Sequence, residues 1–316
     1  MGPWQIERYT PQRREEWDSF VAESRNGTFL FMRGYMDYHA DRFRDCSLMA
    51  FKEGRLRGIL PAELTADKVL HSHRGLTYGG WVTPMAHFDG NDMLELWECW
   101  LRWCRAEGIV GIDYKPVPWI YTRVPAQEDL YALFRYGADM TECTLSSAIS
   151  YAERRPFNTQ QKRNLKRGVK SGSEVREDIS VADFHRLLSN CLAERHGAAP
   201  VHSLAELELL AGRFPDRIRI YGCYQEEALT AGVCIFEVGP AAHCQYIAST
   251  AEGREKGALT LLFAHLIERY GNEGFRYFDF GTSNEEHGRV LNAGLLRQKG
   301  ALGGSGVAYT RYSIVL

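Results

Sequence analysis

The sequence predicts a mixed α/β protein made of two similar halves, each a mixed twisted sheet with helices on both faces. Three observations lead to this fold class. Glu-Gly, four further residues and an Asp-aromatic pair occur at 107–114 and again at 273–280. Each copy follows a segment with apolar residues at helical spacing, which predicts a helix and then a strand. The chain also has 316 residues, enough for two domains of ordinary size.

The first half begins with a helix predicted over 11–24, because Thr10 is a favourable N-cap and Pro11 suits the first turn. Strands are then predicted at 47–51, 57–64 and 69–73, the first two joined by a turn at 52–55. The rest of this half is expected to be a helix at 91–107, a strand at 109–114, a helix at 127–136 and a strand at 140–151.

The second half repeats this plan. Helices are expected at 181–196 and 204–213, and strands at 217–224, 229–238 and 243–249. They are followed by a helix at 257–273, a strand at 275–280, a helix at 285–296 and a closing strand at 307–315. The shared order of elements favours a mixed sheet with helices on its faces in both halves.

A basic segment, residues 153–172, separates the two halves. It carries seven basic side chains from Arg154 to Lys170, with no acidic one after them until Glu174. On a helix, five of them share one face, namely Lys162, Arg163, Lys166, Arg167 and Lys170. Like charges at this spacing repel by roughly a few tenths of a kcal/mol per pair. The segment is therefore a solvated basic helix or a phosphate-binding face, and we favour the second.

Composition is typical of a globular protein and narrows the possible functions. The net charge of -2 discriminates little, and the eight cysteines contain no Cys-x-x-Cys pair, so we expect reduced thiols and no metal site. No apolar run approaches the roughly 20 residues of a membrane span. The first residues lack the basic and apolar regions of a signal peptide. The expected location is cytoplasmic.

Four local patterns are informative as a set, namely Lys-Arg-Asn-Leu-Lys-Arg at 162–167, Phe-Asp-Phe-Gly-Thr-Ser at 278–283, the Gly-rich segment 298–304 and Gly-Leu-Thr-Tyr-Gly-Gly at 75–80. Together they resemble the FemABX-type proteins, a peptidyltransferase-type family that carries two tandem GNAT acyltransferase domains. The resemblance implies a GNAT-like N-terminal domain on the acceptor side at 1–152, a linker helix at 153–172 and a catalytic GNAT-like domain at 173–316. The chain departs from the family at Leu302 and lacks the inserted coiled-coil arm of some members.

The resemblance implies transfer of an acyl or aminoacyl group to an amine. The donor is aminoacyl-tRNA, as in Fem-type proteins, or acetyl-CoA, as in ordinary GNAT enzymes. A CoA site needs backbone N–H groups at a helix start, and Arg254 and Gly257 match its loop whereas Leu259 does not. We favour tRNA because the basic helix suits RNA. The alternatives are an acetyl-CoA-dependent N-acetyltransferase acting on a sugar or peptide amine and a noncatalytic RNA-binding scaffold.

The candidate catalytic residues are Lys299, Asp279 and Tyr246. Lys299 can stabilise a tetrahedral oxyanion, Asp279 ends a strand where it can accept a proton, and the Tyr246 hydroxyl can donate to a carbonyl. Each has a structural alternative. Lys299 can interact with a helix dipole, Asp279 can cap a turn as Asp113 would in the other copy, and Tyr246 can be a buried strand residue.

The binding residues follow from the same resemblance. The donor is expected at Arg163, Lys166, Arg254 and Gly257, and the acceptor at Tyr78, His73 and Asp113. The acceptor is an amine of a small molecule, a peptide or a cell-wall precursor, and the other expected partner is tRNA. No cofactor is expected besides the donor substrate. The tryptophans at 97, 100 and 103 are interpreted as core residues rather than as a surface for base stacking.

Overall fold

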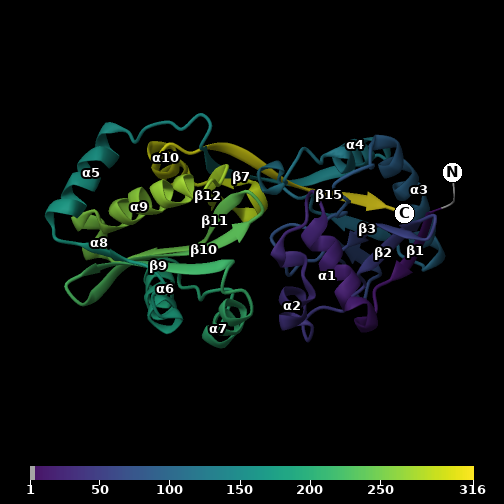
Figure 1. Cartoon of the computed structure of the whole chain (residues 1–316), viewed down its shortest axis with the longest axis horizontal. Coiled ribbons are helices and arrows are strands. Elements are labelled where there is room, and N and C mark those ends of the chain that lie inside the picture. The colour runs from purple at the N-terminus through teal and green to yellow at the C-terminus, as the bar shows by residue number, and fades with distance from the viewer. Residues whose placement is uncertain (1–3) are drawn as a thin grey trace. The chain divides into compact units, whose positions relative to one another are not determined.

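The computed structural model describes residues 4–316 and, for residues 195 and 196, the backbone alone. The chain forms two compact units (Figure 1). Unit 1 comprises the chain up to Thr144 together with Glu286–Arg289 and Ala308–Leu316, and unit 2 comprises Leu145–Glu285 and Val290–Val307. The predicted mixed α/β class is confirmed. Within the described residues, no helix is both long and apolar enough to cross a membrane.

Unit 1 contains two sheets. The first is antiparallel, with the order β1-β2-β3, where β1 is Trp4–Arg8, β2 is Leu48–Lys52 and β3 is Arg55–Leu60. The second contains β4 (Glu63–Leu64), β5 (Val69–His71), β6 (Gly111–Tyr114) and the end of β15 (Ser305–Val315). Strands β5 and β6 are parallel, and the other pairs are antiparallel.

The helices of unit 1 are α1 (Arg14–Glu23), α2 (Arg33–Met36), α3 (Gly90–Ala106) and α4 (Glu128–Arg135). Short 3-10 turns are η1 (Pro11–Arg13), η2 (Phe29–Phe31), η3 (Asp37–His39), η4 (Trp119–Tyr121) and η5 (Glu286–Gly288). Asp89 starts α3 with a capping box. One face of α3 buries Leu96, Trp97 and Trp100, so these tryptophans are core residues as predicted.

Unit 2 is built on one mixed sheet with the order β7-β12-β11-β10-β9-β8. Its strands are β7 (Asp139–Ser150), β8 (Glu174–Arg176), β9 (Ile218–Gln225), β10 (Ala228–Val238), β11 (Ala241–Ser249) and β12 (Tyr277–Thr282). Strands β11 and β12 are parallel, and their neighbours are antiparallel. A separate hairpin joins β13 (Asn284–Glu285) to β14 (Val290–Leu291).

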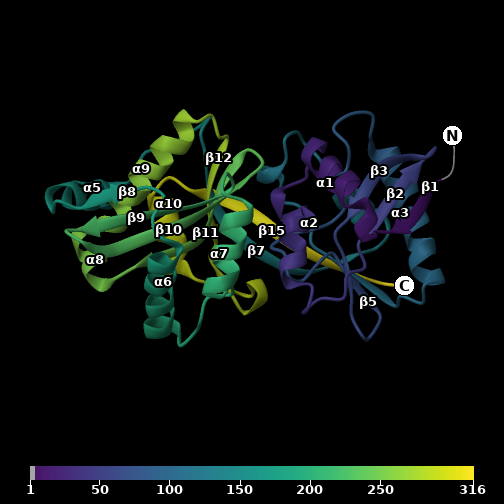
Figure 2. The same cartoon turned by 60° about the horizontal axis from the view of Figure 1, so that its bottom comes forward.

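Helices cover both faces of the sheet in unit 2. In Figures 1 and 2, α5 and α9 lie on one face and α6 and α7 on the other. The helices are α5 (Thr159–Lys170), α6 (Val181–His196), α7 (Leu204–Arg213), α8 (Ala251–Lys256), α9 (Ala258–Asn272) and α10 (Ala293–Ala301). The core forms where Leu262, Phe263 and Leu266 of α9 pack with Val233 and Phe278 of the sheet. Segment 153–172, expected as a linker, contains α5 and belongs to unit 2.

The two copies of the Glu-Gly pattern occupy equivalent places. Helix α3 leads into β6, and α9 leads into β12, as the periodicity predicted. Gly108 and Gly274 have φ values of 68° and 84°, which is the left-handed conformation expected after a helix end. In both units the strand then pairs in parallel with the strand that precedes the helix in the chain.

The last strand of each half joins the unit formed mainly by the other half. The end of β7 pairs with β12 in unit 2, and the end of β15 pairs with β6 in unit 1. The predicted helix at 285–296 is wrong. Residues 284–291 form the β13–β14 hairpin, and His287 and Gly288 in its turn adopt φ values of 54° and 89°, which a right-handed α-helix does not accommodate. The helix α10 starts later, where Asn292 caps Leu295.

Candidate active site

The carboxylate of Asp279 is the centre of a buried polar cluster in unit 2. Its side chain has no exposed surface. Oδ1 accepts hydrogen bonds from Ser146 Oγ at 2.5 Å and from the Gly281 N–H at 3.2 Å. Oδ2 lies 2.6 Å from Nδ1 of His243. Since an unpaired buried carboxylate is strongly unfavourable, these three partners explain how the group is accommodated.

Strand geometry brings these side chains together. In the parallel ladder between β11 and β12, His243 is opposite Asp279, and Ala148 of β7 faces Asp279 on the other side. Within the described strands this parallel pairing ends at His243 and Asp279, although β11 continues to Ser249. The cluster therefore lies where two parallel strands part at their carboxyl ends, the usual place for ligands in α/β sheets.

A β-bulge in β11 lies next to the cluster. Cys234 of β10 pairs with Tyr246 whereas Ile235 pairs with Cys244, so Gln245 is the extra residue. Bulges of this kind are concentrated near active sites, where they redirect side chains. The bulge changes the alternation after His243, and it contributes to the position of Tyr246.

Lys299 lies in the last turn of α10 and is 4% exposed. Its Nζ donates to the carbonyls of Gly281 at 2.8 Å and Thr282 at 2.6 Å, immediately after Asp279 in the chain. Burial lowers the pKa of Lys299 to about 8, although the charge of Asp279 acts in the opposite direction. Gly281 has a φ of 76°, so the chain turns sharply at the point where the ammonium binds. Lys299 thus holds the turn that follows Asp279, and a catalytic role of either residue stays a prediction.

Tyr246 belongs to a different group of contacts. Its Oη lies 2.5 Å from Nδ1 of His202, a buried residue just before α7, and accepts from the His202 N–H at 3.3 Å. The aromatic rings meet edge to face at 5.8 Å. A role for Tyr246 in the reaction stays a prediction, whereas its contact with His202 is a packing role.

The residues expected to bind the donor are divided between an exposed face and a helix junction. Arg163 and Lys166 are exposed on α5. Arg254 lies in α8 and donates through Nη1 to the Ser249 carbonyl at 2.5 Å. Gly257, with a φ of 80°, ends α8 and starts α9. A Cβ atom there would lie 2.2 Å from the Asn164 carbonyl oxygen, so α5 packs directly over this junction.

The residues expected to bind the acceptor lie in unit 1, and two of them are covered by protein. Tyr78 and His73 are each 3% exposed. Tyr78 donates to Thr28 Oγ1 at 3.3 Å and stacks on Tyr121. His73 stacks on His39 with ring centroids 5.0 Å apart, and burial lowers its pKa well below the usual value. Their burial favours a packing role, and acceptor binding by them stays a prediction.

Asp113 is half-buried and strongly paired. Arg311 Nε lies 2.7 and 2.9 Å from the two carboxylate oxygens, and His71 Nδ1 lies 3.5 Å from Oδ2. Burial alone would raise the pKa of Asp113, but the neighbouring His71 and the Arg311 guanidinium outweigh it and lower the pKa. The carboxylate therefore stays ionised.

A His–Asp pair occurs at the same position in both units. His71 is opposite Asp113 in the β5–β6 ladder, and His243 is opposite Asp279 in the β11–β12 ladder, each as the third residue pair. The sequence interpretation did not select His243 or Ser146. A signal was present for His243, because in both halves a histidine precedes the helix and is paired with the aspartate of the repeated pattern at the end of the parallel pairing. No such signal was present for Ser146, because its contact with Asp279 depends on the pairing of β7 with β12 in unit 2.

One pocket of about 470 Å³ lies in unit 2 beside α5. It is lined by Arg154, Pro156, Phe157, Lys162, Leu165, Ala264 and Glu268. Most of its lining is apolar, and its two cations, Arg154 and Lys162, come from the basic segment. Among the described residues, no cluster of His, Cys, Asp and Glu side chains is arranged to hold a metal ion.

Comparison with known proteins agrees with this geometry. Residues 156–289 match the family model described as an acetyltransferase (GNAT) domain. No curated protein has a sequence similar enough to be matched. The fold is similar to that of FemX, with a TM-score of 0.70 and 12% identity over 99% of this chain and 97% of FemX.

Two further solved structures are similar over nearly their whole length. One is the C-terminal domain of a putative lysylphosphatidylglycerol synthetase from Agrobacterium fabrum, with a TM-score of 0.62, 11% identity and coverage of 96% of this chain and 92% of that one. The other is a tandem GNAT protein from the clavulanic acid biosynthesis pathway, with a TM-score of 0.55, 11% identity and coverage of 99% and 98%. The GNAT match supports the predicted acyltransferase activity. The protein therefore has a tandem GNAT fold similar to that of FemX, and the fold that the sequence resemblance implied is confirmed.

Proposed function

We propose that the protein is an N-acyltransferase that moves an aminoacyl group from a charged tRNA to the amine of a peptide, a small molecule or a cell-wall precursor. The GNAT match supports acyl transfer, and the FemX-like fold supports the aminoacyl group. The observation that carries the choice of donor is that α5 covers the start of α9. Its reaction is expected in the cytoplasm, where charged tRNA is available.

A CoA donor would need the backbone N–H groups at the start of the helix that follows β11. Here the residues that match the CoA loop form α8, and Gly257 donates its N–H to the Arg254 carbonyl. Arg167 of α5 donates to the Glu255 carbonyl at 2.6 Å, and Thr260 donates to Gln161 Oε1 at 2.8 Å. Because α5 is fixed over this junction, a pyrophosphate has no cradle there. This disfavours acetyl-CoA.

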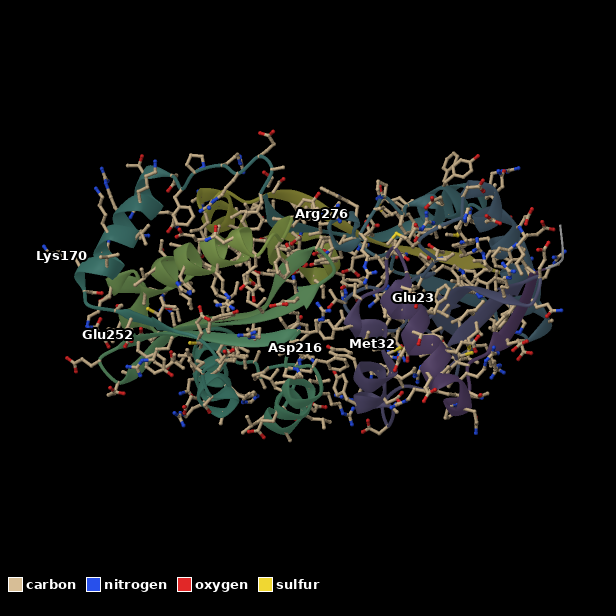
Figure 3. The ribbon with its side chains drawn as sticks, in the orientation of Figure 1. Glu23, Met32, Lys170, Asp216, Glu252 and Arg276 are labelled. Atoms are coloured by element: carbon tan, nitrogen blue, oxygen red, sulfur yellow. The ribbon has the colours of Figure 1, made fainter. Side chains whose placement is uncertain are left out.

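The opposite face of α5 suits a polyanion. Five basic side chains are exposed on this helix, and it contains no acidic residue. Figure 3 shows Lys170 at the far end of α5, directed away from the rest of unit 2. The pocket beside α5 is lined by the cations Arg154 and Lys162 and by apolar residues that include Phe157. Phosphates on the helix and an unpaired base in the pocket are the contacts that single-stranded RNA ends offer.

The first experiment measures binding of an unfractionated tRNA pool as a function of salt. The wild type is expected to show a steep linear fall of log K with log salt. Replacing Arg163 and Lys166 by glutamate should reduce the slope by about 2 or more, because two phosphate contacts are lost. The matched control replaces Arg102 and Arg105 of α3 by glutamate, which changes the charge equally in unit 1. That control should keep the wild-type slope.

The second experiment identifies the donor. The protein is incubated with a pool of tRNA charged with labelled amino acids and, separately, with labelled acetyl-CoA, each with amine acceptors of the three expected classes. We expect label to pass from tRNA to an amine. Consumption of acetyl-CoA alone, with tRNA binding absent or independent of salt, would instead establish an acetyltransferase. Binding of tRNA without consumption of either donor would indicate an RNA-binding scaffold.

A further inference from the structure

We propose that His243 is the general base of the acyl transfer and that Asp279 positions it. The inference rests on the proposed function, because it assigns a role in that reaction to two residues of this site. The role fits the chemistry, since an amine that attacks an ester carbonyl must lose a proton before a stable amide forms.

The geometry of the pair fixes which nitrogen can act. Asp279 Oδ2 lies 2.6 Å from His243 Nδ1, and a carboxylate can only accept a hydrogen bond. Nδ1 therefore carries a proton, and in the neutral ring Nε2 has the lone pair that can accept another. The Asp279 side chain is fully buried whereas His243 keeps 12% of its surface. The ring is thus anchored on its inner edge by a group that substrate does not reach.

The surroundings of Asp279 support the same assignment. Ser146 from β7 and the Gly281 N–H complete the shell of the carboxylate and hold it in one orientation. Two further titratable groups, Lys299 and Cys244, interact electrostatically with Asp279. Burial raises the pKa of the Cys244 thiol well above its usual value, so the thiol stays neutral. The imidazole of His243 is thus held by a carboxylate that is itself fixed by the protein.

The equivalent pair in unit 1 shows what a noncatalytic copy contains. There Arg311 binds both oxygens of Asp113, and the distance from His71 Nδ1 to the carboxylate is 3.5 Å rather than 2.6 Å. A guanidinium that satisfies the carboxylate weakens its hold on the imidazole. The same strand positions thus carry an ion pair in unit 1 and a His–Asp dyad in unit 2.

The proposed step transfers the aminoacyl group to the amine and one proton from the amine to the tRNA ribose. The acceptor amine attacks the ester carbonyl of the aminoacyl-tRNA, and a C–N bond forms as the carbonyl oxygen gains charge. His243 Nε2 takes one proton from the attacking nitrogen. The tetrahedral intermediate collapses, the C–O bond to the tRNA ribose breaks, and the imidazolium returns the proton to the ribose oxygen. The products are an amide and a tRNA with a free hydroxyl.

The kinetic test compares His243→Asn with the wild type on the donor that the wild type consumes. Asparagine can still donate to Asp279, so the buried carboxylate stays paired. We expect kcat to fall by about 10²- to 10⁴-fold, and the ascending limb of the pH–rate profile to disappear. The control His265→Asn removes a histidine that also contacts a carboxylate, Glu177 at 2.9 Å, on the exposed side of α9. An unchanged kcat with an unchanged pH profile in His243→Asn would overturn the proposal.

A spectroscopic test on the wild type is independent of donor and acceptor. In ¹⁵N-labelled protein, His243 should be the Nδ1–H tautomer with a strongly deshielded imidazole proton that Asp279→Asn removes. The opposite tautomer would leave Nε2 without a lone pair and would refute the assignment of His243 as the general base. If neither tRNA nor acetyl-CoA is consumed, the proposed function fails, whereas the tautomer still decides the arrangement of the dyad.

Discussion

Lys299 supports the turn after β12, so its replacement has a structural and a catalytic consequence. In Lys299→Met the carbonyls of Gly281 and Thr282 lose their donor, and the free energy of unfolding should fall by about 1–3 kcal/mol. If the ammonium also stabilises the oxyanion, turnover should fall by roughly 10²- to 10³-fold. Urea unfolding and steady-state kinetics measure the two effects separately.

The matched control is Arg297→Met, which removes an exposed cation from the same helix. This substitution should leave both the free energy of unfolding and the turnover nearly unchanged. Unchanged turnover in a folded Lys299→Met protein would show that the ammonium is structural only. The assignment of chemistry to unit 2 would then rest on His243 and Asp279.

Among the single residues of the candidate site, the sequence predicted those that lie within a recognisable local motif. Asp279 and Lys299 were selected because they stand in such motifs, and the structure brings them to one site. Ser146 is 133 residues away from Asp279 in the chain, and His243 is 36 away. Their contact depends on strand register, which local patterns do not determine. Tyr246 hydrogen-bonds to His202, and the bulge at Gln245 changes which side chains of β11 point to each face of the sheet.

Gly168 sets how closely α5 approaches α9. A Cβ atom at this position would lie 2.9 Å from the Gly257 carbonyl oxygen and 3.0 Å from the Leu261 side chain. Gly168→Ala should therefore displace α5 and lower the free energy of unfolding by about 1–3 kcal/mol. Urea unfolding followed by circular dichroism, with thiol labelling of the buried Cys234 in unit 2, measures this effect.

Gly212→Ala is the matched control, because it makes the same change inside α7, where a Cβ atom meets nothing within 4 Å. It should stabilise the protein by about 0.5–1 kcal/mol, since alanine is the better helix former. Equal effects of the two substitutions would refute the close packing of α5 on the α8–α9 junction.

Among the elements, the long amphipathic helices were the most predictable. The helices expected at 91–107 and 257–273 agree with α3 and α9 to one residue at each end, because their apolar periodicity and the Glu-Gly ending agree. The expected helix at 285–296 failed because left-handed residues and a hairpin interrupt it. Helix α8 was not predicted, since six residues are too few for a periodic pattern.

Removal of residues 308–316 should destabilise unit 1, although they stand at the other end of the chain. Their strand pairs with β6, and Arg311 within them binds Asp113. All seven tryptophans lie in unit 1, so tryptophan fluorescence reports its unfolding alone. We expect a lower urea midpoint in fluorescence. Hydrogen exchange in β9, β10 and β11 of unit 2 should stay protected and serves as the internal control.

An unchanged fluorescence midpoint would show that unit 1 is stable without β15.

The duplication itself was predicted from the repeated Glu-Gly pattern and the shared order of elements. The crossing of β7 and β15 between the units was not, because both strands have the same alternating pattern wherever they pair. Which strand β7 or β15 pairs with depends on the fold of the whole chain.

The position of β15 also fixes when unit 1 can finish folding on the ribosome. Nearly all of unit 1 is synthesised first, yet its sheet lacks a strand until residues 308–316 have been made. At about 5–20 residues per second, translation of the intervening chain takes roughly 10–30 s. During that time the outer edge of β6 is an open template for other strands. A newly made chain should therefore need a chaperone until β15 has been made.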